Sequence, residues 1–228
     1  MNLNLADLPS SFSNDKIIFM KTLLLTSTGA RFDSSEIQKI LPKLQGELKL
    51  GHVMTASKPE PNNTYVTEHV EQLKVLGLSV EDVDIEGKTL EELREFFKDK
   101  DIIYVQGGNT FYLLKAVKES GFDKLVPELL DEGKIYIGIS AGSMICSPTI
   151  ETAGWKNVDA NIVGLKDLNA LNLVPFIIFV HYLPEHRGTI LENAPKSKYP
   201  LKILTDDQAI LVKDDKYQLV GKGPEITL

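Results

Sequence analysis

A short apolar strand that ends at a glycine-bracketed serine is the feature that most constrains this chain. Residues 135–139 form a nearly uninterrupted β-branched run, which is typical of a buried strand of a parallel sheet. Gly138, Ser140 and Gly142 follow in the order Gly-x-Ser-x-Gly. This order indicates a sharp turn from strand to helix that displays one hydroxyl, because small neighbours let the backbone pass without a clash. The ordinary alternative is a glycine-rich turn in which Ser140 caps a helix.

Strand and helix patterns alternate along most of the chain. Their spacing predicts an α/β protein with a doubly wound, mostly parallel sheet. We expect strands at 22–26, 51–56, 79–85 and 101–106, and helices near 33–41 and at 65–76, 90–97, 110–121 and 125–132. After a loop-rich stretch we expect a buried strand at 176–180, and then short strands near 203–204, 209–212 and 217–220, the last two paired across 213–216.

Composition narrows the classes of protein to which the chain can belong. With 228 residues, 43% of them hydrophobic, the chain can form a sizeable core. We interpret residues 20–228 as one domain and residues 1–19 as an N-terminal appendage, because the first convincing strand begins near Met20. A net charge of −7, with acids and bases mixed, favours neither nucleic acid nor an anionic membrane as a partner.

The single cysteine, Cys146, excludes an intramolecular disulfide and a thiolate zinc site. A reducing cytoplasm is therefore the expected location. No apolar run approaches the roughly 20 residues that a membrane span needs. We expect no metal or cofactor, and either a monomer or a homodimer.

A nucleophilic serine requires a base, and four histidines are available. His52 and His69 belong to the early strand and to a charged helix, where a structural or solvated role is the better interpretation. His181 ends the strand at 176–180, and active sites of open α/β sheets gather at such carboxyl ends. That position favours His181 over His186, and it implies that Ser140 and His181 meet at one edge of a single sheet.

Two further groups complete the candidate site. Asp206, in the turn Thr205-Asp206-Asp207 between two expected strands, is a plausible carboxylate to orient the imidazole. Its competitors are Glu185, Glu192 and Asp167, and an acid in a turn is usually only a solvated acid. The loop Gly107-Gly108-Asn109 offers a backbone amide that, with the amide of Ala141, would form an oxyanion hole. The ordinary interpretation of this loop is a helix entry capped by Asn109.

These motifs together resemble the aspartyl dipeptidase (peptidase E) family of serine peptidases, of which cyanophycinases are distant members. The resemblance is carried by Gly107-Gly108-Asn109-Thr110, by the segment 138–142, by Pro148-Thr149-Ile150 and by the strand that ends in His181, and it extends over about 22–220. It implies the flavodoxin-like sheet of class I glutamine amidotransferases and no metal.

Transferred by motif, the resemblance implies Ser140 as nucleophile, His181 as base, and the amides of Gly108 and Ala141 as oxyanion donors. Asp206 stands where the family usually has a glutamate, which shortens the side chain by one methylene. Gly107 and Asn109 of the same loop are expected to contact the substrate.

The chain departs from the family after the histidine, where an arginine is thought to read an aspartate side chain. Only Arg187 is available there. A surface charge is the more common role for a loop arginine, so a preference for Asp-X peptides is open.

The sequence therefore predicts a serine peptidase that cleaves short peptides, with dipeptides as the expected substrates. An esterase of the α/β-hydrolase kind shares the serine turn, but it places its acid before a more distant histidine. A binding module that keeps the amidotransferase-like sheet without chemistry is the alternative from another class.

Overall fold

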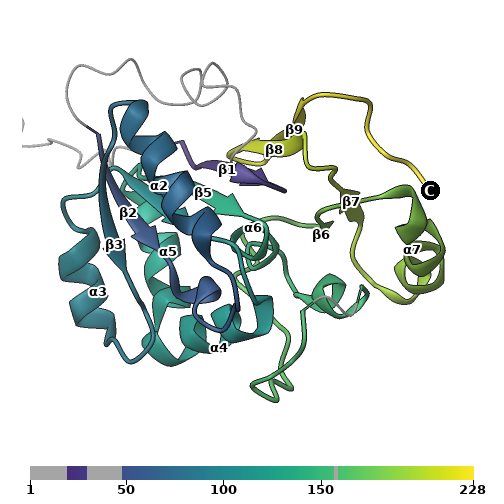
Figure 1. The fold of residues 1–228 in the computed structure, drawn as a ribbon, viewed down its shortest axis with the longest axis horizontal. Coiled ribbons are helices and arrows are strands. Elements are labelled where there is room, and N and C mark those ends of the chain that lie inside the picture. The colour runs from purple at the N-terminus through teal and green to yellow at the C-terminus, as the bar shows by residue number, and fades with distance from the viewer. Residues whose placement is uncertain (1–19, 30–47, 157–158) are drawn as a thin grey trace, which may run out of the picture.

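A seven-stranded sheet forms the centre of the computed structural model, which describes residues 20–29, 48–156 and 159–228 (Figure 1). The strands are β1 (Thr22–Thr26), β2 (Lys49–Val53), β3 (Ser79–Val83), β4 (Ile102–Val105), β5 (Ile135–Ile139), β8 (Gln208–Lys213) and β9 (Lys216–Gly221). Their order is β3-β2-β4-β5-β1-β8-β9. The strands from β3 to β1 are parallel, whereas β8 and β9 are each antiparallel to the preceding strand. The carboxyl ends of β4, β5 and β1 therefore meet at one edge.

Helices cover both faces of this sheet. Alternate residues of β1 show the division: Leu23 and Leu25 belong to one core cluster and Leu24 to another. The first cluster contains residues of α3 (Leu90–Phe97), α4 (Thr110–Ser120), α5 (Phe122–Asp131) and α6 (Ala141–Met144), and the second contains Leu73 of α2 (Thr64–Val75). The doubly wound, mostly parallel α/β fold is confirmed.

A separate two-stranded parallel sheet, β6 (Ile177–Phe179) and β7 (Leu201–Ile203), lies to the right of the main sheet in Figure 1. Between these strands runs α7 (Arg187–Asn193), whose Ile190 packs with Phe179 and Ile203. The expectation of a single sheet for Ser140 and His181 is therefore wrong: β6 is buried, but it pairs with β7. Hydrophobicity predicts that a strand is buried and does not specify its partner.

Most element boundaries agree with the sequence patterns. The expected hairpin is the β8–β9 pair. The strand expected at 51–56 ends at Val53, and Thr55–Ser57 instead form a buried 3₁₀ helix. The expected helix near 33–41 and the segment 1–19 lie outside the described residues, so the proposed domain boundary stays a prediction. None of the helices in the described ranges is long and apolar enough to cross a membrane.

Candidate active site

The backbone at Ser140 turns sharply between β5 and α6. Its φ of 48° and ψ of −108° lie outside the ordinary left-handed region, a strain that costs about 1–3 kcal/mol. The two glycines are sterically required: a Cβ at Gly142 would lie 2.1 Å from the Val105 carbonyl oxygen, and one at Gly138 would lie 2.6 Å from that of Gly142. Ser140 occupies the N-cap position of α6, but its hydroxyl makes no helix-capping bond and is left for other contacts.

The structure brings Ser140, His181 and Asp206 together. Nε2 of His181 lies 2.9 Å from Oγ of Ser140, and Nδ1 lies 2.6 Å from Oδ1 of Asp206. His181 follows β6, and Asp206 lies in the turn between β7 and β8. The side chains of His181 and Asp206 are each 40% exposed, so the imidazole is open to solvent beside the serine.

Ser27, which follows β1, is a member of this cluster that the sequence analysis missed. Its buried hydroxyl accepts a hydrogen bond from the His181 backbone amide at 2.8 Å and donates one to Oδ1 of Asp206 at 3.1 Å. His181 has a φ of 53°, an unfavourable conformation for a non-glycine residue. Ser27 therefore holds both the strained histidine backbone and the carboxylate. Its place directly after a strand of the sheet was the available signal.

Two backbone amides beside Ser140 have no protein acceptor within the described part of the chain, namely those of Gly108 and Ala141. Gly107 brings its loop close to the serine, because a Cβ there would lie 3.0 Å from the Cβ of Ser140. Gly108 has a φ of 139°, and a Cβ at this position would lie 2.2 Å from the Ala56 carbonyl oxygen. The two amides are therefore unengaged hydrogen-bond donors on segments next to Ser140.

Asn109 caps α4 through its side chain, as the ordinary interpretation of this loop predicts. Its Oδ1 accepts from the amide of Tyr112 at 2.9 Å, and its Nδ2 donates to the Ala160 carbonyl oxygen. Because the whole side-chain amide is engaged by the protein, Asn109 acts on the site by holding the loop. Only the backbone of Asn109 is therefore available for the substrate contact expected from the sequence.

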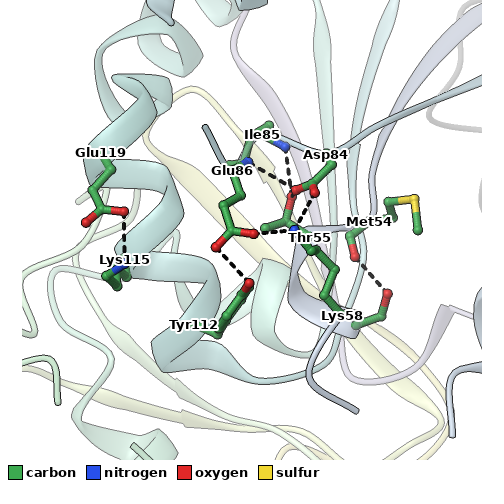
Figure 2. A network of polar contacts seen from close by, with 10 residues as sticks. Met54, Thr55, Lys58, Asp84, Ile85, Glu86, Tyr112, Lys115 and Glu119 are labelled. Atoms are coloured by element: carbon green, nitrogen blue, oxygen red, sulfur yellow. Dashed lines mark hydrogen bonds and ion pairs between the residues drawn. The ribbon is translucent and has the colours of Figure 1, made fainter. Parts of the chain in front are cut away.

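The turn that supports Gly108 is anchored by a polar network, which Figure 2 shows. The Asn109 amide donates to the Ala56 carbonyl oxygen at 2.9 Å, and Ala56 belongs to the 3₁₀ helix Thr55–Ser57. Thr55 Oγ1 donates to Asp84 at 2.8 Å, and Lys58 pairs with both Asp84 and Glu86. The hydrogen bonds that Lys58 donates to these two carboxylates raise the pKa of Lys58, which therefore stays charged.

A pocket of about 420 Å³ opens beside Ser140. Ser140, His181, Asp206, Gly107 and Gly108 all line it. The remaining lining residues are Ser27, Thr28, Glu60, Tyr65, Glu68, His69, Gln106, Ile139 and Asp159. This volume fits a ligand the size of a short peptide segment.

Arg187 does not line this pocket. It is exposed at the start of α7, which is anchored to the small sheet through Ile190. The arginine therefore has no contact with the space beside Ser140 from which to read a substrate carboxylate.

The competing acids and the other histidines have separate roles. Asp167 pairs with Lys118, Glu192 pairs with Lys196, and Glu185 is exposed. His186 accepts a hydrogen bond from the amide of Leu183. His52 is fully buried against Asp82, in keeping with the structural role expected for it. His69, for which a structural or solvated role was also expected, instead lines the pocket.

Cys146 lies just after α6 and is buried. Burial raises the pKa of its thiol to about 12, so the cysteine is a protonated core residue. Among the described residues, no group of three His, Cys, Asp or Glu side chains could hold a metal ion.

Comparisons with known proteins identify related peptidases. An uncharacterized peptidase of Listeria monocytogenes is 35% identical over 190 residues, which cover 82% of this chain and 86% of that protein. Peptidase E of Shigella sonnei is 31% identical over 181 residues, or 76% of each chain. The crystal structure of a candidate peptidase E protein from L. monocytogenes aligns with a TM-score of 0.79 and 33% identity, covering 90% of this chain and all of that one.

A more distant crystal structure, of a peptidase from an acI-B1 Actinobacterium, shares the fold with a TM-score of 0.67 at 18% identity. A model of peptidase family S51 matches residues 23–220, nearly the whole described chain. The protein therefore belongs to peptidase family S51.

Proposed function

We propose that this peptidase hydrolyses short peptides through Ser140, His181 and Asp206. Two distances support this proposal above all: 2.9 Å from Nε2 of His181 to the serine hydroxyl, and 2.6 Å from Nδ1 to Asp206. This is the order nucleophile, base and orienting carboxylate that an activated serine requires. The shorter aspartate is long enough to reach the imidazole where the family usually has a glutamate.

The first half of the reaction follows from these contacts. Oγ of Ser140 attacks the peptide carbonyl carbon while its proton passes to Nε2 of His181. The amides of Gly108 and Ala141 stabilise the oxyanion, a contribution of about 3–4 kcal/mol in comparable sites. His181 then gives the proton to the leaving amine as the C–N bond breaks.

The second half regenerates the enzyme. A water molecule transfers a proton to His181 and attacks the acyl-serine ester. Collapse of this second tetrahedral intermediate releases the carboxylic acid and returns the proton to Ser140.

Two alternatives have less support. An α/β-hydrolase places its acid before its histidine in the chain, whereas Asp206 follows His181. A non-catalytic binding module has no need of an intact serine–histidine–aspartate arrangement at a strained turn. The expected location, a reducing cytoplasm, rests on the single buried cysteine.

Labelling with a fluorophosphonate and hydrolysis of a dipeptide library test this function. The wild-type protein should be labelled at Ser140 and cleave dipeptides, and Ser140→Ala should lose both properties while unfolding at the wild-type temperature. Ser147→Ala is a matched control, because its buried hydroxyl has no hydrogen-bond partner in the described structure. Undiminished dipeptide hydrolysis by Ser140→Ala would refute the assignment.

A further inference from the structure

The pocket beside Ser140 carries charge of one sign. Glu60, Glu68 and Asp159 contribute carboxylates to its lining, in addition to the Asp206 that pairs with His181. Within the described ranges, no lysine or arginine side chain lines it. An anionic pocket attracts a cationic ligand and repels an anionic one.

The lysines close to these carboxylates in sequence are engaged elsewhere. Lys58, two residues before Glu60, pairs with Asp84 and Glu86, as Figure 2 shows. Lys156, three residues before Asp159, donates to the Val180 carbonyl oxygen and lies 4.5 Å from the centre of the Phe179 ring. Lys156 makes no ion pair among the described residues, although its charge attracts Asp159 and Asp206 at a distance. Neither lysine pairs with Glu60.

Glu60 is the carboxylate with the strongest need for a counterion. Its half-buried side chain has no hydrogen-bond or ion-pair partner among the described residues. Burial, and then repulsion from Asp159, raise the pKa of Glu60. Asp159, by contrast, accepts hydrogen bonds from the amide and the hydroxyl of Thr110. A bound cation would relieve the repulsion at Glu60.

His69 is an independent feature of the pocket that favours a polar ligand. Its side chain, on α2, is only 8% exposed, and Nδ1 accepts a hydrogen bond from the side-chain amide of Gln106 at 2.9 Å. The other ring nitrogen, Nε2, has no partner within the described part of the chain, although the side chain lines the pocket. This nitrogen is not among the buried polar atoms that lack a partner, so it faces the pocket and is available to hydrogen-bond a ligand there.

His69 adds no positive charge to the pocket. Burial lowers the pKa of His69, which favours the neutral imidazole near pH 7. Gln106 is itself fixed, because its Oε1 lies 3.3 Å from Nε2 of His52, whose Nδ1 lies 2.7 Å from Asp82. The orientation of His69 is therefore set before a ligand arrives.

We propose that the pocket selects peptides with an unblocked, basic N-terminal residue, with Glu60 as the main specificity-determining carboxylate. The α-ammonium of the substrate balances one of the three carboxylates, and a lysine or arginine side chain balances a second. His69 provides the polar contact beside them. An N-terminal aspartate would instead add a further negative charge to an anionic pocket. This inference rests on the proposed peptidase function.

Four dipeptides with a common leaving residue, Lys-Leu, Arg-Leu, Leu-Leu and Asp-Leu, test the inference with the wild-type protein. We expect kcat/KM for the two basic substrates to exceed that for Leu-Leu at least tenfold and that for Asp-Leu at least 100-fold. Acetylation of the α-amine should lower cleavage of Lys-Leu at least tenfold. If all four dipeptides resist cleavage, the proposed function fails. If Asp-Leu or Leu-Leu is cleaved as well as Lys-Leu, only the present inference fails.

Variants that change one charge test whether Glu60 determines the preference. Glu60→Gln should reduce the Lys-Leu over Leu-Leu preference at least fivefold, mainly through KM, and Glu60→Lys should raise Asp-Leu above Lys-Leu. Glu71→Gln is the matched control, since Glu71 is exposed on α2, pairs with Lys74 and does not line the pocket. If the Glu60 variants do not fold, the exposed Glu68→Gln takes their place. An unchanged preference in every folded variant would overturn the assignment.

Discussion

Replacement of Ser27 by alanine removes its contacts with His181 and Asp206 and leaves the residues Ser140, His181 and Asp206 themselves unchanged. The lost contacts are the 3.1 Å hydrogen bond to the Asp206 carboxylate, the 2.8 Å bond from the His181 amide and a 3.4 Å contact with Nδ1 of His181. A hydrogen bond to a charged group contributes about 1.5–3 kcal/mol, and an orphaned buried amide costs about 1–3 kcal/mol. Both values are upper bounds here, because the His181 amide contact is part-buried and the Asp206 side chain is 40% exposed. These effects overlap, so we expect the free energy of unfolding to fall by about 3 kcal/mol.

This loss has a thermal and a kinetic consequence. For a chain of this size, about 3 kcal/mol corresponds to a decrease in Tm of about 6–12 °C. The 2.6 Å contact between His181 and Asp206 survives, but both partners lose their common support. We therefore expect the rate of fluorophosphonate labelling at Ser140, and kcat/KM for a dipeptide, to fall about 10–100-fold, which equals about 1.4–2.7 kcal/mol.

The control for Ser27→Ala is Ser120→Ala. Ser120 is also buried, but its hydroxyl makes only 3.4 Å contacts with Val117 and Phe122 at the end of α4. This control should lose about 1 kcal/mol or less of stability and keep the labelling rate. A Ser27→Ala protein with the wild-type Tm and labelling rate would show that Ser27 does not support the site.

Two other predictions concern the scaffold of the site. Gly108→Ala should lower the free energy of unfolding by at least about 3 kcal/mol in urea titrations, because the new Cβ clashes with the Ala56 carbonyl oxygen at a φ of 139°. The control Gly188→Ala, on α7 with open space around it, should be neutral or stabilising. Equal stabilities of the two variants would contradict the steric argument. The Cys146 thiol should resist iodoacetamide in the native protein at pH 8 and react in urea, because burial raises its pKa to about 12. The unfolded thiol titrates near pH 8.5–9, so its ionisation should lower the free energy of unfolding as the pH rises from there towards 12. Cys146→Ala should lack this pH-dependent loss of stability. Rapid alkylation of the native protein would show that the thiol is not buried.

Local sequence determined the strand before Ser140, the serine turn and the alternation of strands and helices. Gly138 and Gly142 specify the turn because any side chain at either position would collide with backbone only a few residues away or on the neighbouring β4. The apolar runs specify β1, β4 and β5, because a short continuous run of apolar residues is typical of a buried strand. The loop 107–109 was recognisable for the same reason, since it follows one of these strands directly.

The tertiary structure alone decided which side chains surround Ser140. Ser27 lies 154 positions from His181 in the chain. Its place after a strand puts it at the correct edge of the sheet, but nothing local shows that it contacts His181 and Asp206. Glu60 and His69 were equally inconspicuous, because a charge in a loop and a histidine on a helix become pocket residues only when the chain is folded. The partner of β6 was likewise undetermined, since hydrogen bonding between strands depends on which edges are free in the folded chain. Sequence thus specified the hydroxyl and its turn, while the carboxylates and imidazole that line its pocket came from contacts between distant segments.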